Sequence, residues 1–319
     1  MVAGAGLAGC IGGGGGGGGG VTIMQPEGTI FYPFFESAVD EGIFDDEGVD
    51  LTVEYRPFPA QVQSITSNEV PTAQVSVMPY LANAGRGEDL VMYGLDGTLQ
   101  IINSLYVLTS SDYHSVQDLV GERIGVWSFG SSTVQSFQAL LADRTGLRLR
   151  EDFETTTAAP PALVGLLQDG EVDGIIDISG ISIAMESQPD TFRNIAQLNQ
   201  WWIDRTGFTL PLTGWFAYAD WYEDNTDVAA GLIRGARRAV DNFRDNTVSI
   251  LEEFGEPAGI DNQAKIDVVE RWANAGQVYH GEQTSEYLEA TWEFVQLMSD
   301  QGFIEQVPEQ SSVLRNPLE

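Results

Sequence analysis

The stretch VQDLVGERIGVWSFGSSTVQSFQALLADRTG, residues 116–146, contains the repeating unit on which the fold prediction rests. Its first part, Val116–Val126, is typical of a short helical turn followed by a strand. Its amphipathic part, Val134–Leu141, predicts a helix that ends at Gly146. The loop Trp127–Thr133 therefore connects the end of a strand to the start of a helix, which is where α/β proteins place ligand-binding groups.

The same alternation of strands and helices extends along most of the chain. On the N-terminal side, strands are predicted at 21–24, 50–56, 73–77 and 90–93, with helical segments at 32–44, 61–66 and 79–84. On the C-terminal side follow a strand at 104–109, a helix at 162–169, an apolar strand at 174–178, a return strand at 215–218 and helices beyond residue 228. This order predicts an α/β fold with mostly parallel sheets, helices on their faces and binding groups at the carboxyl ends of the strands.

The composition is strongly acidic, with 47 Asp and Glu against 15 Lys and Arg and a formal net charge of −32. A surface of this charge repels nucleic-acid phosphates and anionic lipid headgroups, so we expect no nucleic-acid binding. The acidic residues are spread along the chain, and Lys265 is the only lysine. This composition resembles that of haloarchaeal proteins and predicts a protein that stays soluble in high salt, where charges are screened. The alternative is an acidic protein from ordinary salt.

The N-terminal segment Leu7-Ala8-Gly9-Cys10 precedes an unbroken glycine run, Gly12–Gly20, and holds the only cysteine of the chain. One cysteine alone forms neither an intramolecular disulfide nor a zinc site. The segment resembles the lipobox of secreted lipoproteins, which implies that Cys10 is lipidated. The nine glycines would then be a flexible tether with a root-mean-square span of about 15–18 Å. The alternative is a disordered tail with an incidental cysteine.

Residues 1–9 contain no arginine or lysine, although a secretion signal begins with a charged segment. We therefore expect the start of this chain to lie inside a longer signal peptide. Past Gly20 the sequence has no stretch of about 18 apolar residues, so we expect no other membrane-spanning segment.

Four motifs follow one another along the chain: Tyr32–Phe44 (YPFFESAVDEGIF), Asp118–Val126 (DLVGERIGV), Gly130–Ser132 and Leu167–Gly174 (LQDGEVDG). In this order they resemble the solute-binding proteins of ABC importers, in the group that serves nitrate, sulfonates, taurine and the pyrimidine precursor of thiamine. The resemblance extends over most of residues 21–250. It implies a two-lobed type II periplasmic-binding-protein fold, in which the chain crosses between the lobes twice.

From this resemblance we expect residues 1–20 to form the lipobox and tether, residues 21–106 and 219–319 to form lobe 1, and residues 107–218 to form lobe 2. A small solute would bind in the cleft between the lobes, and its contacts with both would favour the closed form. The loaded form would dock on an ABC permease at the extracellular face of the cytoplasmic membrane, where the lipid anchor raises its effective concentration. We expect a monomer without a cofactor or metal.

The best candidate ligand site is the loop before the helix predicted at 134–141. Helix N-termini present free N–H groups and a partial positive charge, which suit an anion. The candidate residues are Trp127, Ser128, Phe129, Gly130, Ser131 and Ser132. Glycine permits a close approach of the backbone, and either serine hydroxyl can donate a hydrogen bond. The alternative is that one of these serines only caps the helix.

Equivalent loops supply further candidates, which are Thr29, Tyr32, Pro79 and Tyr80 in lobe 1 and Asp177 and Ser179 in lobe 2. Helix capping or core packing are the alternatives for these residues. Five aromatic residues could stack on a planar heterocycle, and core packing is the more frequent alternative. They are Trp127, Phe129, Trp201, Trp202 and Trp215. Arg56 follows a strand of lobe 1 and either pairs with an anionic solute or forms a surface salt bridge.

Related folds include enzymes, among them dehydratases of an alternative menaquinone route and a fungal thiamine-pyrimidine synthase, so the fold alone does not decide the function. The residues favour binding. Cys10 precedes the tether, Lys265 lies in the helical C-terminal part, and His114 and His280 show neither pairing nor metal-ligand spacing. We therefore expect a binding protein rather than an enzyme. Its solute stays open between an oxyanion or sulfonate, which helix N-termini favour, and a pyrimidine-like heterocycle, which the tryptophans favour.

Overall fold

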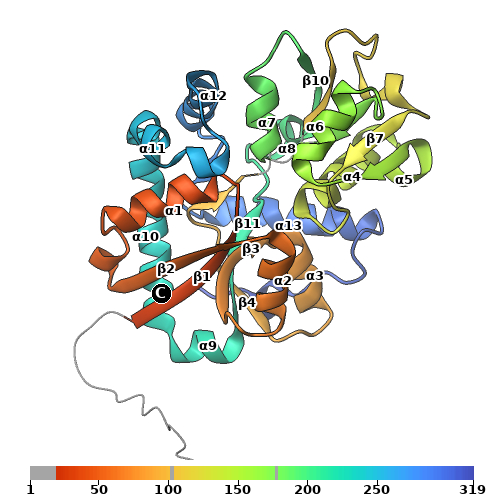
Figure 1. Cartoon of the computed structure of the whole chain (residues 1–319). Coiled ribbons are helices and arrows are strands. Elements are labelled where there is room, and N and C mark those ends of the chain that lie inside the picture. Colours follow the sequence, from red (N-terminus) through yellow and green to blue (C-terminus); the bar gives the residue numbers. More distant parts are fainter. Residues whose placement is uncertain (1–18, 101–103, 177–178) are drawn as a thin grey trace, which may run out of the picture.

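The computed structural model describes residues 19–100, 104–176 and 179–319 of the chain. Its sheets gather in two lobes that are covered by helices, one in the lower part of Figure 1 and one at the upper right. This is the α/β architecture that the alternating pattern predicts. Cys10 and the glycines up to residue 18 lie outside the described residues, so the tether and the lipid anchor stay predictions.

The upper lobe, lobe 2, is built on a five-stranded sheet with the strand order β10-β6-β9-β7-β8. Its strands are β6 (Ser104–Leu108), β7 (Arg123–Val126), β8 (Glu154–Thr157), β9 (Gly174–Ile176) and β10 (Phe192–Gln197). Strand β7 is parallel to β8 and β9, whereas β6 is antiparallel to β9 and β10. The central strands are apolar because helices cover the sheet, and Ile124, Val126 and Ile176 are buried.

The helical elements of lobe 2 follow its strands in chain order. They are η2 (Val116–Leu119), α4 (Ser132–Thr145), α5 (Leu149–Asp152), α6 (Pro160–Gln168), α7 (Ser179–Glu186) and α8 (Leu198–Thr206). Helix α4 ends at Gly146 in the left-handed conformation (φ 75°), which is the predicted stop.

The lower lobe, lobe 1, contains three small sheets. Strand β1 (Gly19–Pro26) is parallel to β2 (Val49–Arg56), and β11 (Thr213–Tyr218) lies antiparallel between β3 (Thr72–Ser76) and β4 (Leu90–Gly94). The third sheet is the two-stranded ribbon of β5 (Thr98–Leu99) and β12 (Tyr279–His280). Helices and turns complete the lobe: α1 (Phe31–Asp40), η1 (Asp45–Glu47), α2 (Phe58–Thr66), α3 (Val77–Gly85), α9 (Ala219–Asp224), α10 (Thr226–Asp245), α11 (Thr247–Phe254), η3 (Glu256–Ala258), α12 (Gln263–Asn274), α13 (Ser285–Asp300) and α14 (Gln310–Val313).

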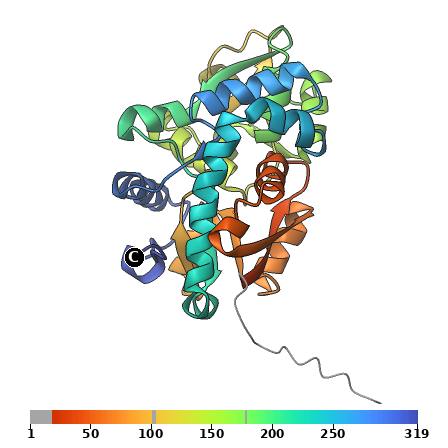
Figure 2. The same ribbon diagram turned by 90° about the vertical axis from the view of Figure 1, so that its left-hand side faces the viewer.

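Helix α10 is the longest element and runs along the side of lobe 1, where it is the cyan helix of Figure 2. Its buried residues recur at helical spacing and include Leu232, Ala236 and Phe243. Gly235 allows the helix to approach η1 and its neighbours, because a Cβ at this position would lie 2.4 Å from the ring of Phe44. The C-terminal half of the chain thus completes the core of lobe 1.

Strand pairing bears on the boundaries between the lobes. From the sequence, lobe 2 is predicted to end at residue 218. In the structure, Thr213–Tyr218 pairs with β3 and β4 and so belongs to a sheet of lobe 1. Conversely, Ser104 already pairs in the sheet of lobe 2. A strand predicted only from its residues carries no information about its partners, which is why the sequence misses this assignment. We propose that the two crossings lie between β5 and β6 and between α8 and β11.

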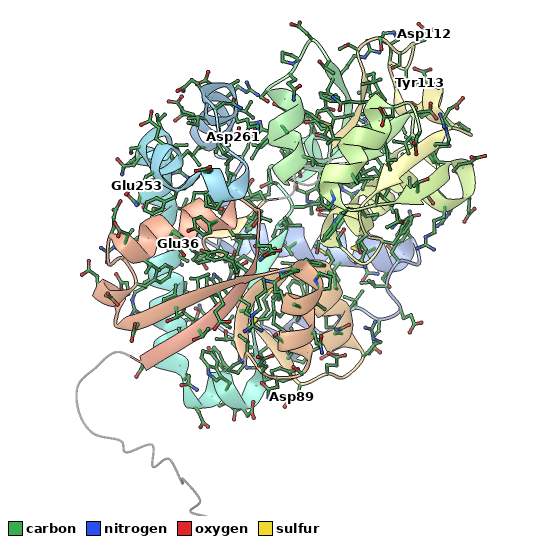
Figure 3. All side chains as sticks on the ribbon, viewed as in Figure 1. Glu36, Asp89, Asp112, Tyr113, Glu253 and Asp261 are labelled. Atoms are coloured by element: carbon green, nitrogen blue, oxygen red, sulfur yellow. The ribbon has the colours of Figure 1, made fainter. Side chains whose placement is uncertain are left out.

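Acidic side chains surround both lobes. Figure 3 labels Asp89, Asp112, Glu253 and Asp261 at the periphery, on four different parts of the fold. This distribution matches the spread of acidic residues along the sequence. Within the described residues, the helices include none with the length and apolar character needed to span a bilayer.

Candidate functional site

The N-termini of two helices from different lobes meet at the centre of the molecule. Helix α3 begins directly after β3 of lobe 1, and α4 begins after β7 of lobe 2. The backbone N–H of Met78 in α3 donates a hydrogen bond to Oγ of Ser132 in α4, at 3.3 Å, and Ser132 is fully buried. Each helix start directs N–H groups and a partial positive charge toward this contact. The structure therefore joins two anion-favouring ends across the lobes.

The loop before α4 is held by its serines. The Oγ of Ser131 accepts a hydrogen bond from the Val134 N–H at 3.3 Å and donates one to the Ser128 carbonyl at 2.9 Å. Ser131 is therefore the N-cap, so the capping alternative applies to it. The Oγ of Ser128 accepts from the Gly130 N–H at 3.3 Å. These bonds order a loop in which Gly130 is exposed and a Cβ would meet only Ser128 Oγ, at 3.7 Å.

Trp127, at the end of β7, contacts lobe 1 through an aromatic pair. Its ring packs edge-to-face on Phe58 of α2, with ring centroids 4.7 Å apart. The indole Nε1 is buried, and no group among the described residues accepts its hydrogen bond. Because buried donors almost always have a partner, this N–H is available to a bound molecule. Phe58 was not among the residues predicted from the sequence.

Gln25 is a second buried polar group that the sequence analysis missed. It is fully buried at the end of β1, its Nε2 donates to the Gln74 carbonyl at 3.4 Å, and its Oε1 has no donor within the described part of the chain. Nearby, Gln61 of α2 donates to the Met24 carbonyl at 2.8 Å. The only sequence signal for Gln25 is a polar residue that continues the apolar run before Pro26.

The two residues predicted at the loop after β1, Thr29 and Tyr32, make different contacts. Thr29 donates its hydroxyl to the Pro26 carbonyl at 2.8 Å and so stabilises the turn. Tyr32 is half-buried in the first turn of α1, and its ring lies 4.7 Å from that of Tyr55. Burial, with a further contribution from Glu36, raises the pKa of Tyr55 above its usual range, so its hydroxyl stays neutral.

Several predicted residues lie away from the meeting point of α3 and α4. Trp215 is fully buried in the core of lobe 1, where its Nε1 donates to the Asp96 carbonyl at 2.9 Å. Trp202 is buried against Phe294 of α13, with ring centroids 5.2 Å apart. Both residues take the core-packing alternative that the sequence left open, although Nε1 of Trp202, like that of Trp127, is buried without an acceptor among the described residues.

Tyr80 and Arg56 also take the alternatives that the sequence left open, which are core packing and a surface salt bridge. Tyr80 points into lobe 1 against Phe216, and burial raises the pKa of its hydroxyl. Arg56 pairs with Glu54 at 2.7 Å and with Glu69 at 3.8 Å, so it forms the surface salt bridge that the sequence analysis kept as its alternative.

The remaining predicted residues are placed as follows. Pro79 is half-buried in the first turn of α3. Phe129 lies under the guanidinium of Arg150, 3.8 Å from its ring centroid, and Trp201 lies under that of Arg144 at 5.4 Å. Ser179 is the first residue of α7, and Asp177 lies outside the described residues.

A second contact joins the lobes on the side of α7 and α12. Nη2 of Arg271 in α12 lies 2.5 Å from Oε2 of Glu186 in α7, and the Tyr106 hydroxyl donates to the other oxygen of Glu186 at 3.0 Å. A small crevice of about 40 Å³ lies beside this ion pair. A larger hollow of about 270 Å³ lies on lobe 2 near Arg144 and Trp201. Neither hollow includes the α3–α4 meeting point, where the lobes are in direct contact.

Residues 32–246, about two thirds of the chain, match the model of the family described as NMT1/THI5 like. This chain belongs to the NMT1/THI5-like family. The matched range contains α3 and α4. No curated protein matches the chain.

Solved structures with the same fold are similar to this chain over nearly its whole length. The alkanesulfonate-binding protein SsuA from Xanthomonas axonopodis pv. citri, bound to MOPS, is similar at a TM-score of 0.73 and 15% identity, over 95% of this chain and 100% of that one. The CA3427 gene product of Candida albicans, described as having the generic periplasmic binding protein structural fold, is similar at 0.65 and 14%, over 92% and 96%. The periplasmic-binding-protein fold is thereby confirmed.

An enzyme also has this fold. The desulfurization enzyme DSZB is similar at a TM-score of 0.64 and 14% identity, over 92% of this chain and 96% of that one. The NMT1/THI5-like family and the fold are therefore compatible with both binding and catalysis. The residues of the site have to distinguish between these two functions.

The ion pair between Glu186 and Arg271 gives a first prediction for this NMT1/THI5-like protein. If a solute binds between the lobes, as the sequence predicts, Arg271→Gln should weaken its binding by at most about fivefold at low salt, because an exposed ion pair contributes about 0.2–1 kcal/mol. The loss should vanish in high salt. Isothermal titration with taurine at both salt levels measures this effect. Arg244→Gln is the matched control, because the ion pair of Arg244 in the described part of the chain is with Asp241 of its own helix. Equal losses in both variants would contradict a role in closure.

Proposed function

We propose that this chain is the extracellular solute-binding subunit of an ABC importer and captures a small organic or oxyanionic solute by hinge closure. The observation that supports this most is the α3–α4 contact. Met78 N–H meets Ser132 Oγ across the lobes, and the buried N–H of Trp127, in the loop that leads to α4, has no acceptor among the described residues. An anionic group would find helix N-termini from both lobes and one indole donor.

Because the proposed site is divided between the two lobes, a solute that binds there would bring the lobes together. A solute that contacts only one lobe gains little, whereas a solute that reaches α3 and α4 together favours the form in which the lobes touch. The pair of Phe58 and Trp127 lies between α2 of lobe 1 and the loop of lobe 2, so it forms only on closure. The two contacts between the lobes, at α3–α4 and at α7–α12, support this proposal.

The proposed partners are a permease in the cytoplasmic membrane and the membrane itself. Lipidation of Cys10 and the glycine tether would keep the monomer at the extracellular face, where its effective concentration at the permease is high. Mass spectrometry of the membrane fraction checks the anchor, because an unmodified Cys10 in the soluble fraction would contradict it.

The enzymatic alternative is tested by the same binding experiments. Taurine, propanesulfonate, MOPS, nitrate and the pyrimidine precursor of thiamine are offered in turn, and the mixture is analysed for products. A binding protein gives saturable stoichiometric binding, a smaller radius of gyration in solution scattering and unchanged solute. Turnover of any of these compounds would favour the enzyme, and binding without compaction would exclude hinge closure.

Trp127→Phe tests the indole donor directly. Phenylalanine keeps a ring against Phe58 and removes only the N–H, so we expect the Kd of taurine to rise by about 5–30-fold, from the loss of roughly 1–2 kcal/mol for a buried hydrogen bond. Titration calorimetry measures it. Trp201→Phe is the control, because Trp201 lies on α8 under Arg144 and away from the α3–α4 contact. An unchanged Kd for Trp127→Phe would exclude a hydrogen bond to the solute.

A further inference from the structure

Gln25 holds a buried hydrogen-bond acceptor whose orientation is fixed. Its Nε2 donates to the Gln74 carbonyl, which directs Oε1 away from that contact. The side chain of Gln74 is engaged elsewhere: one N–H of its Nε2 donates to the Gly97 carbonyl and its Oε1 accepts from Thr213. Gln25 is fully buried, and no donor reaches its Oε1 from the described residues. An acceptor left in this state costs about 1–3 kcal/mol.

Gln25 lies near the carboxyl end of β1, the end at which ligands of open α/β sheets bind. It is the second-to-last residue of this strand, which leads directly into the loop before α1. Helix α2 connects it to Trp127. Gln61 donates to the carbonyl next to Gln25, and Phe58, three residues earlier on the same helix face, packs on Trp127.

Helix α2 thus contacts both the neighbour of Gln25 and Trp127, and Gln25 and Trp127 each have a buried polar atom without a partner among the described residues. One is a donor on lobe 2, the Trp127 indole N–H, and the other is an acceptor on lobe 1, the Gln25 carbonyl oxygen. An anion alone satisfies the donor and leaves the acceptor unpaired. We infer that the solute carries an N–H or O–H donor in addition to its anionic group, and that Gln25 selects for this donor. The inference rests on the proposed function.

This selection should be strong, because a site built to hydrogen-bond a solute rejects an analogue that lacks the group far better than a hydrophobic pocket rejects an extra methylene. Ethanesulfonate, taurine and isethionate form a suitable series, since they share a sulfonate on two carbons and differ only in having no donor, an ammonium group or a hydroxyl group. We expect wild-type protein to bind taurine and isethionate at least tenfold more tightly than ethanesulfonate. This comparison needs no variant.

Gln25→Met then tests the residue. Methionine has a similar length and no acceptor of this kind, so the preference over ethanesulfonate should fall to less than threefold, mainly through weaker binding of taurine and isethionate. Gln61→Met is the matched control, because this buried glutamine has its amide donor satisfied by Met24. It should retain the wild-type preference even if the melting temperature falls.

The possible outcomes test the proposed function and the inference about Gln25 separately. Wild-type protein that binds none of the three sulfonates or the other solutes offered overturns the proposed function. Wild-type protein that binds all three sulfonates equally leaves that function in place and overturns the inference about Gln25. Equal weakening of all three by Gln25→Met also overturns it, because that pattern indicates a structural role only. If Gln25→Met does not fold, the wild-type preference decides alone.

Discussion

Gly130→Asp should raise the Kd of taurine by about 100-fold at low salt, whereas Gly130→Asn should leave it within about threefold of the wild-type value. The new carboxylate would stand beside the α4 N-terminus, where we propose that the anionic group of the solute binds. Two like charges about 6 Å apart repel by roughly 2.8 kcal/mol at an effective dielectric constant of about 20, which is about 100-fold in affinity.

The fold should tolerate this substitution. Gly130 is exposed, and the nearest atom to a new Cβ would be Ser128 Oγ at 3.7 Å. An acidic residue is also favourable before the start of a helix, because it complements the partial positive charge there. Stability should therefore stay the same or rise slightly while binding falls, which separates the site from the scaffold.

Titration calorimetry of both variants in low and high salt measures the effect. Screening shortens the range of the repulsion, so the loss in Gly130→Asp should shrink as salt rises. If Gly130→Asn weakens binding as much as Gly130→Asp, the cause is steric. If neither variant weakens binding, the anionic group of the solute does not lie at α4.

Three helices near the C-terminus could be predicted almost to the residue, because periodicity and capping residues agree there, whereas α10 begins at Thr226, three residues before its predicted start at Ala229. The sequence predicts helices at 247–254, 264–274 and 285–299, and the structure has α11, α12 and α13 within one residue of these bounds. The side chains of Asn262 and Thr284 cap α12 and α13. Local signals of this kind do not depend on what the helix packs against.

Helix α2 shows where local signals mislead. The prediction begins it at Gln61, after two prolines, but proline is tolerated in the first turn of a helix, and α2 begins at Phe58. This difference of one turn hides the residue that packs on Trp127. The partner itself could not be predicted, because α2 and the loop after β7 meet only when the lobes touch.

Other parts of the site depend equally on tertiary contacts. The sequence identifies Ser131 and Ser132 as equivalent candidates, yet one caps α4 and the other accepts the Met78 N–H from lobe 1. Trp215 follows the strand pattern that the sequence predicts, but the pattern alone does not say which face of the sheet meets the core. Gln25 carries no motif, and its unpaired oxygen is visible only once Gln74 and its partners are placed.

His280 should make the stability of the protein depend on pH between about pH 7 and pH 5. It lies in β12, which pairs with β5 next to the crossing into lobe 2, and its ring stacks on Tyr287 with centroids 3.7 Å apart. Its Nε2 is buried and finds no partner among the described residues. Burial lowers the pKa of His280 to about 4. The histidine is therefore neutral in the folded protein at neutral pH.

The sign of the effect follows from the two pKa values. In the unfolded chain the histidine has its ordinary pKa of about 6.5, so below this pH the unfolded state binds a proton that the folded state does not. The stabilisation is complete above pH 6.5 and is lost as the pH falls toward 4. The full loss is about 3 kcal/mol, from roughly 1.36 kcal/mol for each pKa unit.

Urea unfolding at fixed salt between about pH 5 and pH 7 isolates this contribution, because ordinary carboxylates titrate mostly below that range. The chain has only two histidines. His280→Phe keeps an aromatic ring against Tyr287 and removes the titrating group, so it should flatten the pH dependence, while His114→Asn, at an exposed position, should retain the wild-type slope. Equal slopes in wild type and His280→Phe would show that His280 gains a proton as easily when folded as when unfolded. The β5–β12 ribbon would then be open to water in the folded protein, although it lies beside the proposed crossing between the lobes.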